Sequence, residues 1–179
     1  MTECAVMIAL ATILSLYKII ELPSGGSITA LSMVPLIVLS YRNGLKWGVF
    51  SGFVFGLIQL LIGISALKGV SAITVVGSFF LDYLLAFGSL GLAGLFKNSK
   101  FNPALALGLG AALGTIVRFL CHFISGFLLW SSLVDEGFGA ITYSFGYNIT
   151  YMGPEIVATI VGCVILGGTI AVVGKRKTV

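Results

Sequence analysis

The sequence predicts an all-α membrane protein in which six transmembrane helices form a single domain over residues 1–179. Hydrophobic residues make up 58% of the chain and charged residues only 9%, and the mean hydropathy is +1.13. This composition leaves too few polar residues to cover a soluble protein of this size. Polar, glycine-containing and proline-containing breaks also divide the chain into six apolar stretches, most of which approach the roughly 20 residues that a helix needs to cross a bilayer.

The expected spans are 3–20, 28–41, 46–64, 72–95, 103–128 and 152–174. The first continues the apolar character that begins at Met1, and no basic region precedes it, so it is not read as a cleaved signal peptide. The second is short and follows the turn-forming segment 23–27, so we expect it to be partly re-entrant or to start deep in the protein. A long polar and aromatic loop, residues 130–150, is expected before the sixth span.

Basic residues in the connecting segments orient the chain, because Lys and Arg are retained on the cytoplasmic side of a membrane. With the N-terminus inside, the cytoplasmic segments contain Arg42, Lys46, Lys97, Lys100, Lys175, Arg176 and Lys177. The opposite segments contain only Lys18 and Lys68. This bias predicts that both termini are cytoplasmic. It also accounts for the net charge of +4 without a nucleic-acid partner.

Small residues recur at spacings that let helices approach closely in lipid. They form three sets: Gly48, Gly52 and Gly56 on the third span, Gly88, Gly91 and Gly94 at the end of the fourth, and Ala5 and Ala9 on the first. We expect packing within the bundle, and the alternative is a docking face for another membrane protein.

Three ionisable residues interrupt the apolar spans: Asp82 in the fourth, and Arg118 and His122 in the fifth. Charges within a bilayer are costly, so they usually serve a ligand, an ion or a partner charge. Arg118 and His122 are four residues apart and therefore share one helix face. Asp82 enters from the opposite direction, and a rise of about 1.5 Å per residue brings all three to a similar depth in the outer half of the bundle. The sequence therefore predicts a buried polar site.

Two interpretations of this site remain open. In the first, Asp82 and Arg118 form an ion pair that only neutralises two buried charges; in the second, a ligand uses these groups, because buried ion pairs are poor sources of stability. Aromatic and amide side chains after the fifth span lie on the same side of the membrane and could hold a heteroaromatic ring. Glu155 could line the site or simply favour the N-terminus of the sixth helix.

Long strings in the chain resemble the S component of an energy-coupling factor (ECF) vitamin transporter, in particular the thiamine-specific ThiT family. The strings run in the same order through nearly the whole chain: MTECAVMIALATILSLY, PLIVLSYRNGLKWGVFSGFVFGL, FLDYLLAFGSLGLAGLF, RFLCHFISGFLLW and GFGAITYSFGYN. The resemblance implies a single substrate-binding domain in the prokaryotic cell membrane, which captures thiamine from outside in a pocket closed by loops. It also implies partners, namely a membrane-embedded T component and two cytoplasmic ATPase subunits.

The resemblance also implies roles for particular residues. The substrate-binding positions fall on Asp82, Tyr83, Arg118, His122, Trp130, Tyr143 and Asn148. The small pair that docks the T component falls on Ala5 and Ala9. No metal site, cofactor or catalytic residue is implied.

Several positions depart from the family pattern. A pocket tryptophan is replaced by Gly26, a nearby acid by Ala30 and a tyrosine by Ala72, while Asp82 is one methylene shorter than the expected glutamate. These changes remove part of an aromatic cage. The ligand could therefore be thiamine, a thiamine precursor or a related heterocycle.

Other classes of function are less well supported by the sequence. An intramembrane enzyme would use His122 with Asp82 or Glu155, but the chain has no HExxH motif, no GxSxG motif and no second histidine. A passive channel would need a repeated ring of charges or a filter-like loop. The three cysteines, Cys4, Cys121 and Cys163, lack metal-ligand spacing and are expected to be small buried residues. No GxxxxGK[ST] loop is present, so ATP hydrolysis by that route must come from partners.

Overall fold

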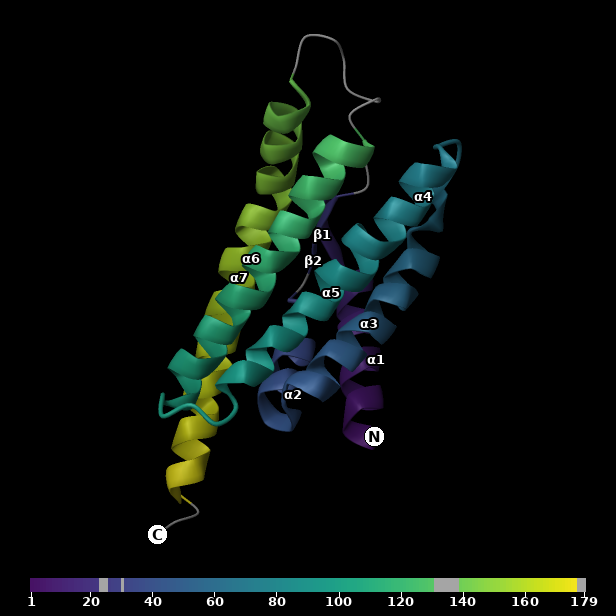
Figure 1. The fold of residues 1–179 in the computed structure, drawn as a ribbon. Helices are drawn as coiled ribbons and strands as arrows, with labels where there is room; N and C mark the ends of the chain where they lie inside the picture. The colour runs from purple at the N-terminus through teal and green to yellow at the C-terminus, as the bar shows by residue number, and fades with distance from the viewer. Residues whose placement is uncertain (23–25, 30, 131–138, 177–179) are drawn as a thin grey trace.

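The described helices group into six helical rods, which lie roughly side by side in a bundle (Figure 1). The computed structural model describes residues 1–22, 26–29, 31–130 and 139–176, with side chains as far as residue 171. Five of the rods are single helices: α1 (Thr2–Leu16), α2 (Val34–Asn43), α3 (Leu45–Ile62), α6 (Pro103–Leu129) and α7 (Ala140–Arg176). The remaining rod joins α4 (Ala72–Ser78), the π-helix η2 (Phe79–Leu85), α5 (Ala86–Gly88) and the 3-10 helix η3 (Ser89–Phe96).

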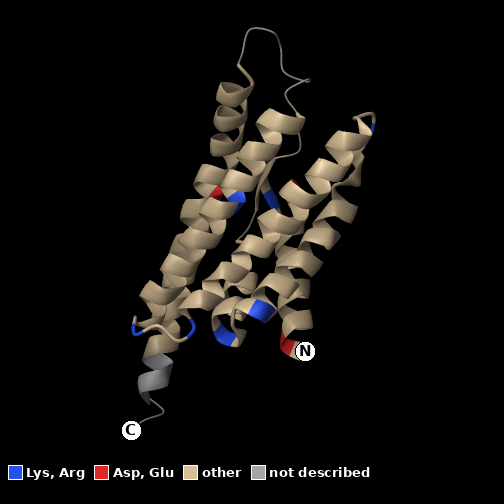
Figure 2. Cartoon of the chain, in the orientation of Figure 1, with Lys and Arg blue, Asp and Glu red and all other residues tan. Residues whose placement is uncertain are grey.

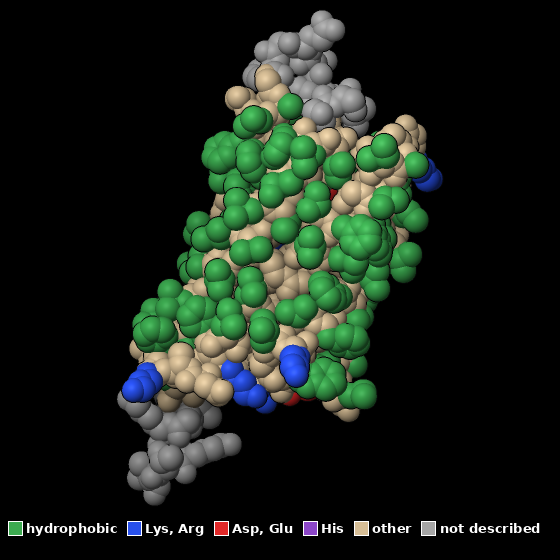
Figure 3. Space-filling view, viewed as in Figure 1, with side chains coloured by type: hydrophobic (Ala, Val, Ile, Leu, Met, Phe, Trp, Pro, Cys, Tyr) green, Lys and Arg blue, Asp and Glu red, His purple; other side chains and the backbone are tan. Residues whose placement is uncertain are grey.

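Four of the rods are long and apolar enough to cross a membrane: Leu45–Ile62, Ala72–Phe96, Pro103–Leu129 and Ala140–Ala171. Hydrophobic side chains cover the visible face between the two ends of the bundle (Figure 3). The chain starts at the same end as α7 finishes, and Lys and Arg gather at that end (Figure 2). The fold is therefore that of a polytopic all-α membrane protein, and the charge distribution follows the positive-inside rule for cytoplasmic termini.

The first two expected spans are wrong in their boundaries. Helix α1 ends at Leu16 and α2 begins only at Val34. Between them β1 (Lys18–Glu21) and β2 (Ser27–Thr29) form an antiparallel pair that aligns Lys18 with Thr29 and Glu21 with Ser27. Pairing with β2 satisfies backbone groups of β1, whose four residues are all exposed. The expectation that the second span starts deep in the protein is confirmed.

The expected loop over residues 130–150 is also wrong in part, because α7 already begins at Ala140. Pro154, which lies near the expected start of the sixth span at residue 152, is inside α7. A proline is tolerated within a membrane helix because neighbouring groups can satisfy the backbone that it frees. The structure thus adds three helical turns at the outer end of α7. Asp135 and Glu136, which the sequence assigns to a loop, lie outside the described residues.

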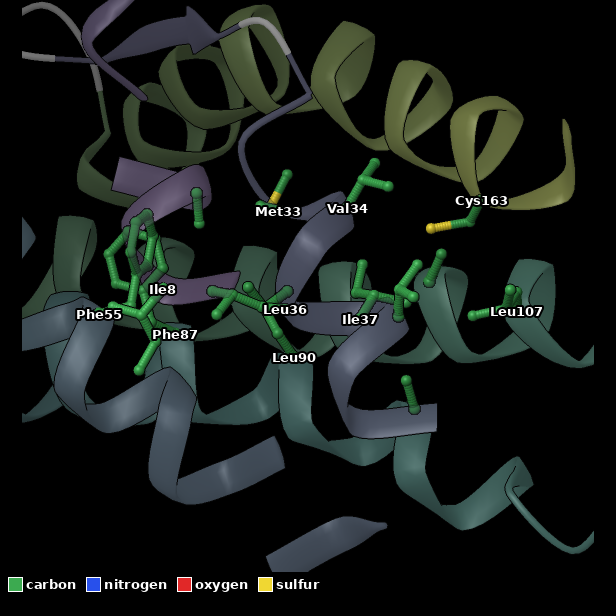
Figure 4. Packing of buried hydrophobic residues seen from close by; sticks show 14 residues of the cluster. Ile8, Met33, Val34, Leu36, Ile37, Phe55, Phe87, Leu90, Leu107 and Cys163 are labelled. Carbon is green, nitrogen blue, oxygen red and sulfur yellow. The ribbon is translucent and has the colours of Figure 1, made fainter. Parts of the chain in front are cut away.

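Helix α2 is the centre of the core. Residues 34–40 are all buried, as expected for a short helix that is apolar all round. Figure 4 shows Leu36 and Ile37 lying between Phe55 and Phe87 on one side and Leu107 on the other. Helix α2 thus lies in the hydrophobic core, with the longer helices packed around it.

The glycines of the third and fourth spans pack against each other, as expected. A methyl group on Gly52 would overlap the carbonyl oxygen of Phe87, and one on Gly56 would lie 2.5 Å from the carbonyl oxygen of Tyr83. Gly91 meets the backbone of Val49 in the same way. This glycine seam brings α3 and residues 83–94 into backbone contact, and it makes internal packing the role of these glycines.

Substitution at the seam is expected to destabilise the protein. In Gly52→Val the new side chain would force the two helices apart, at a cost of about 1–3 kcal/mol. Thermal unfolding in detergent should show a lowered midpoint. The matched control is Gly146→Val, since nothing lies within 4 Å of a Cβ at Gly146. Equal midpoints for both variants would contradict the seam.

Candidate ligand-binding site

A cavity of about 1000 Å³ lies among α3, η2, α6, α7 and the β1–β2 pair. All seven residues expected to bind substrate line it: Asp82, Tyr83, Arg118, His122, Trp130, Tyr143 and Asn148. They come from three separate stretches of the chain, so their convergence is a property of the fold. Their role in binding a ligand remains a prediction.

Asp82 and His122 form the first of two polar clusters in the cavity. The Nδ1 atom of His122 lies 3.0 Å from Oδ1 of Asp82, and the Ser125 hydroxyl donates to the other carboxylate oxygen at 2.6 Å. In the neutral imidazole Nδ1–H donates to Asp82, which leaves Nε2 as an acceptor. Nε2 is buried and has no hydrogen-bond partner among the described residues. The cluster therefore places a carboxylate in the cavity wall, beside an imidazole nitrogen that has neither exposed surface nor a partner among the described residues.

The π-helix η2 places Asp82 and Tyr83 in the cavity wall. A π-helix has i→i+5 hydrogen bonds, is rare and is frequent at functional sites. The glycine seam begins within this π-helix, because Tyr83 lines the cavity and its backbone carbonyl contacts Gly56.

Arg118 and Glu155 form the second cluster, about one helical turn further from the outer end of α6. Their side chains are 10% and 3% exposed, and Arg118 Nη1 lies 3.2 Å from Oε2 of Glu155. The Thr29 hydroxyl donates to Oε1 of Glu155 at 2.6 Å. The Arg118 guanidinium also lies 4.8 Å from the centre of the Phe87 ring.

This arrangement corrects two expectations. The ion pair considered for Asp82 and Arg118 is replaced by two pairs, Asp82–His122 and Arg118–Glu155. Glu155 does not sit at a helix N-terminus; it is buried in the cavity wall. The sequence signal for Glu155 was its place in an apolar stretch, which Pro154 obscured.

The tyrosines of α7 supply aromatic surface along one face of the cavity. Tyr143, Tyr147 and Tyr151 recur every fourth residue and all three line it. The rings of Tyr143 and Tyr147 are nearly parallel at 6.1 Å, and those of Tyr147 and Tyr151 are 5.6 Å apart. The Tyr151 hydroxyl donates to Oδ1 of Asn148 at 2.9 Å, which fixes the Asn148 amide.

Trp130 closes the same side from the end of α6, and its Nε1–H donates to the Ser78 hydroxyl at 3.2 Å. This hydrogen bond ties the tryptophan to the rod that carries Asp82. The aromatic ring is thereby held at the cavity wall.

Gly26 explains one of the departures from the family pattern. A Cβ at this position would lie 2.7 Å from Tyr151 Cδ1 and 2.9 Å from the Tyr147 hydroxyl, and the Gly26 N–H donates to that hydroxyl at 2.8 Å. The missing tryptophan thus leaves room that the α7 tyrosines use. Ala72 begins α4 and is exposed, and Ala30 lies outside the described residues.

The cavity is suited to a small aromatic cation. It combines π faces, a carboxylate and several hydrogen-bonding groups, as ligand sites commonly do. Across the described part of the chain, no group of three His, Cys, Asp or Glu side chains could hold a metal ion. The Ser125 hydroxyl donates to Asp82 and not to His122, so these three residues do not form a nucleophile–base chain.

Ala5 and Ala9 lie away from the cavity, on the exposed face of α1. Val6, Leu10 and Ile13 are exposed beside them. This apolar, small-residue face is open to lipid or to a membrane partner.

Together, the fold and the cavity define a multi-pass membrane protein with a large cavity lined by polar and aromatic side chains. The family model for the thiamine transporter protein matches residues 1–173, and the chain belongs to this family. It is a family of membrane transporters and not of enzymes.

Curated relatives agree with this membership. The thiamine transporter ThiT of Bacillus subtilis is 32% identical over 176 residues, which cover 91% of this chain and 88% of that protein. The thiamine transporter ThiT of Lacticaseibacillus paracasei is 29% identical over 147 residues, which cover 75% and 69%. A solved structure of ThiT from Listeria monocytogenes matches with a TM-score of 0.71 and 24% identity, over 98% of this chain and 92% of that one. The last match supports the fold.

The anchoring of the β1–β2 pair on Glu155 can be tested by Thr29→Val. The substitution removes a hydrogen bond to a buried carboxylate and should cost about 1.5–3 kcal/mol, read as a lowered unfolding midpoint. Thr150→Val is the matched control, since Thr150 is exposed and its hydroxyl bonds only within α7. A midpoint no lower than that of the control would contradict the anchoring.

Proposed function

We propose that this chain is the substrate-capture (S) subunit of an ECF-type importer and that thiamine is the ligand of its cavity. The observation that carries the proposal is the convergence of all seven expected residues on one cavity, in a chain that belongs to the thiamine transporter family. The ligand enters from outside and is released inward when partner ATPases turn over.

In this proposal Asp82 balances the positive charge of the thiazolium ring. The free Nε2 of His122 accepts a hydrogen bond from the amino group of the pyrimidine ring, and the amide of Asn148 orients the polar edge. Trp130 and Tyr143 cover the ring faces, where stacking and cation–π attraction favour a flat cation. Tyr83 offers a hydroxyl beside Asp82, and Arg118 forms part of the floor.

The cavity is large enough to admit ligands related to thiamine. At about 1000 Å³ it lies at the upper end of the range for small-molecule sites. A thiamine precursor or a related heterocycle would use the same groups, and titrations with the separate pyrimidine and thiazole halves distinguish these ligands from thiamine.

Binding can be followed by tryptophan fluorescence, since the chain has two tryptophans and only Trp130 lines the cavity. Thiamine should quench the emission of the parent protein and of Trp47→Phe. Trp130→Phe should lose the quenching. It should also bind thiamine about tenfold more weakly in isothermal titration, because a phenylalanine ring offers a smaller stacking surface than an indole. If the parent protein shows neither binding heat nor quenching at micromolar thiamine, thiamine is not the ligand of this cavity.

The proposal also includes a T component and two ATPase subunits as partners, with Ala5 and Ala9 on the docking face. Bulky side chains there, in Ala5→Trp/Ala9→Trp, should reduce co-purification with the T component at least about tenfold by blocking close helix approach. Thiamine affinity should stay at the parent value, because both alanines lie outside the cavity. Val157→Trp, at a residue 61% exposed on α7, is the control. Equal loss of partner in control and test variants would refute this docking face.

A further inference from the structure

Basic side chains from two distant segments converge at the cytoplasmic end of the bundle. Arg42 and Lys46 flank Gly44, where α2 turns into α3. Lys97 directly follows η3, and its Nζ would lie 4.0 Å from a Cβ at Gly44. The glycine seam brings the end of η3 this close to the start of α3. The positive-inside rule places cations on one side of a membrane but does not require them to meet at one point. Arg42, Lys46 and Lys97 are called the basic corner below.

The basic corner has an excess of positive charge. Glu3 lies 3.1 Å from Arg42 Nε, and the other carboxylate side chains among the described residues line the cavity. Lys46 and Lys97 are both exposed, and neither has an acidic partner in the described part of the chain. Two ammonium groups held beside each other repel, and an anion between them would relieve the repulsion.

Exposed apolar side chains continue from the basic corner toward the middle of the bundle. Trp47 follows Lys46, and Phe50 lies almost one turn further along α3. They are 42% and 56% exposed, with their rings edge to face at 6.2 Å. On the neighbouring rod, Leu95 precedes Lys97 by two residues and is 56% exposed. Figure 3 shows basic side chains at the lower edge of the visible face, with hydrophobic side chains directly above them. This surface matches an amphiphile with an anionic head and an apolar tail.

We propose that the basic corner binds the headgroup of an anionic phospholipid in the cytoplasmic leaflet. Lys46 and Lys97 contact the lipid phosphate through their ammonium groups. The acyl chains lie against Trp47 and Phe50, because tryptophan is typical of the headgroup level and the phenylalanine lies deeper. A free phosphate ion would use only the lysines and leave the apolar surface unexplained. None of these residues lines the large cavity, so the lipid site is independent of the ligand proposed above.

Quenching of Trp47 tests the lipid site directly. The chain has two tryptophans, so Trp47 is the one emitter in full-length Trp130→Phe. This protein is reconstituted in phosphatidylcholine and titrated with brominated phosphatidylglycerol or with brominated phosphatidylcholine. A lysine near an anionic headgroup strengthens binding about fivefold, so the anionic lipid should quench at a concentration at least about fivefold lower. Equal quenching by the two brominated lipids would overturn the proposal.

A matched pair of variants in the same background locates the site. Lys97→Gln should lower the preference for the anionic lipid about fivefold. Lys68→Gln makes the same change of charge beyond the opposite end of α3 and should leave the preference unchanged. An equal loss in both variants would mean that overall charge, and not the basic corner, attracts the lipid.

Two further outcomes are decisive. If Lys97→Gln does not fold, Lys46→Gln takes its place, and an unchanged preference there refutes the role of the basic corner. If the lysine variants keep the lipid preference but lose co-purification with the T component, the basic corner is a contact with a protein partner and the lipid site is refuted.

Discussion

The architecture depends on the requirement that every backbone polar group at membrane depth find a partner within the protein. Helix α2 has 10 residues and a length of about 15 Å, roughly half of the hydrocarbon thickness. The other half of its path is taken by the β1–β2 pair, whose strands bond to each other and whose Gly26 bonds to α7. A short helix capped by a two-stranded pair fills less volume than a full span. The cavity occupies the space that remains.

The buried charges are subject to the same requirement for a partner. A lone charge is costly in this environment, and the structure gives each one a local partner: His122 and Ser125 for Asp82, and Glu155 for Arg118. The two pairs differ in net charge. Arg118 and Glu155 cancel, whereas Asp82 has a partner that can remain neutral. The polar interior is thus stable and still leaves the Asp82 carboxylate charge to pair with a bound ligand.

Much of this could be predicted from the sequence, and the limits have physical causes. Charged residues in apolar stretches identified Asp82, Arg118 and His122, and helical spacing gave their common depth. The resemblance supplied Trp130, Tyr143 and Asn148. The β1–β2 pair could not be predicted, because its strands are too short for a period-two pattern to stand out from the flanking helices. The role of Glu155 stayed open between the site and a helix N-terminus, because a proline that usually marks a helix start lies within a membrane helix.

The π-helix at residues 79–85 has a consequence for how this site can change over time. Its wider turns act as one residue inserted into a helix, so the register of the preceding residues is uncoupled from that of the glycines behind it. Deleting one residue would rotate Asp82 and Tyr83 by about 100° while leaving the contacts of Gly88, Gly91 and Gly94 with α3 in place. Ligand recognition and bundle assembly nevertheless meet on this rod at Tyr83, which lines the cavity and whose backbone contacts Gly56, so a change of register there alters both at once.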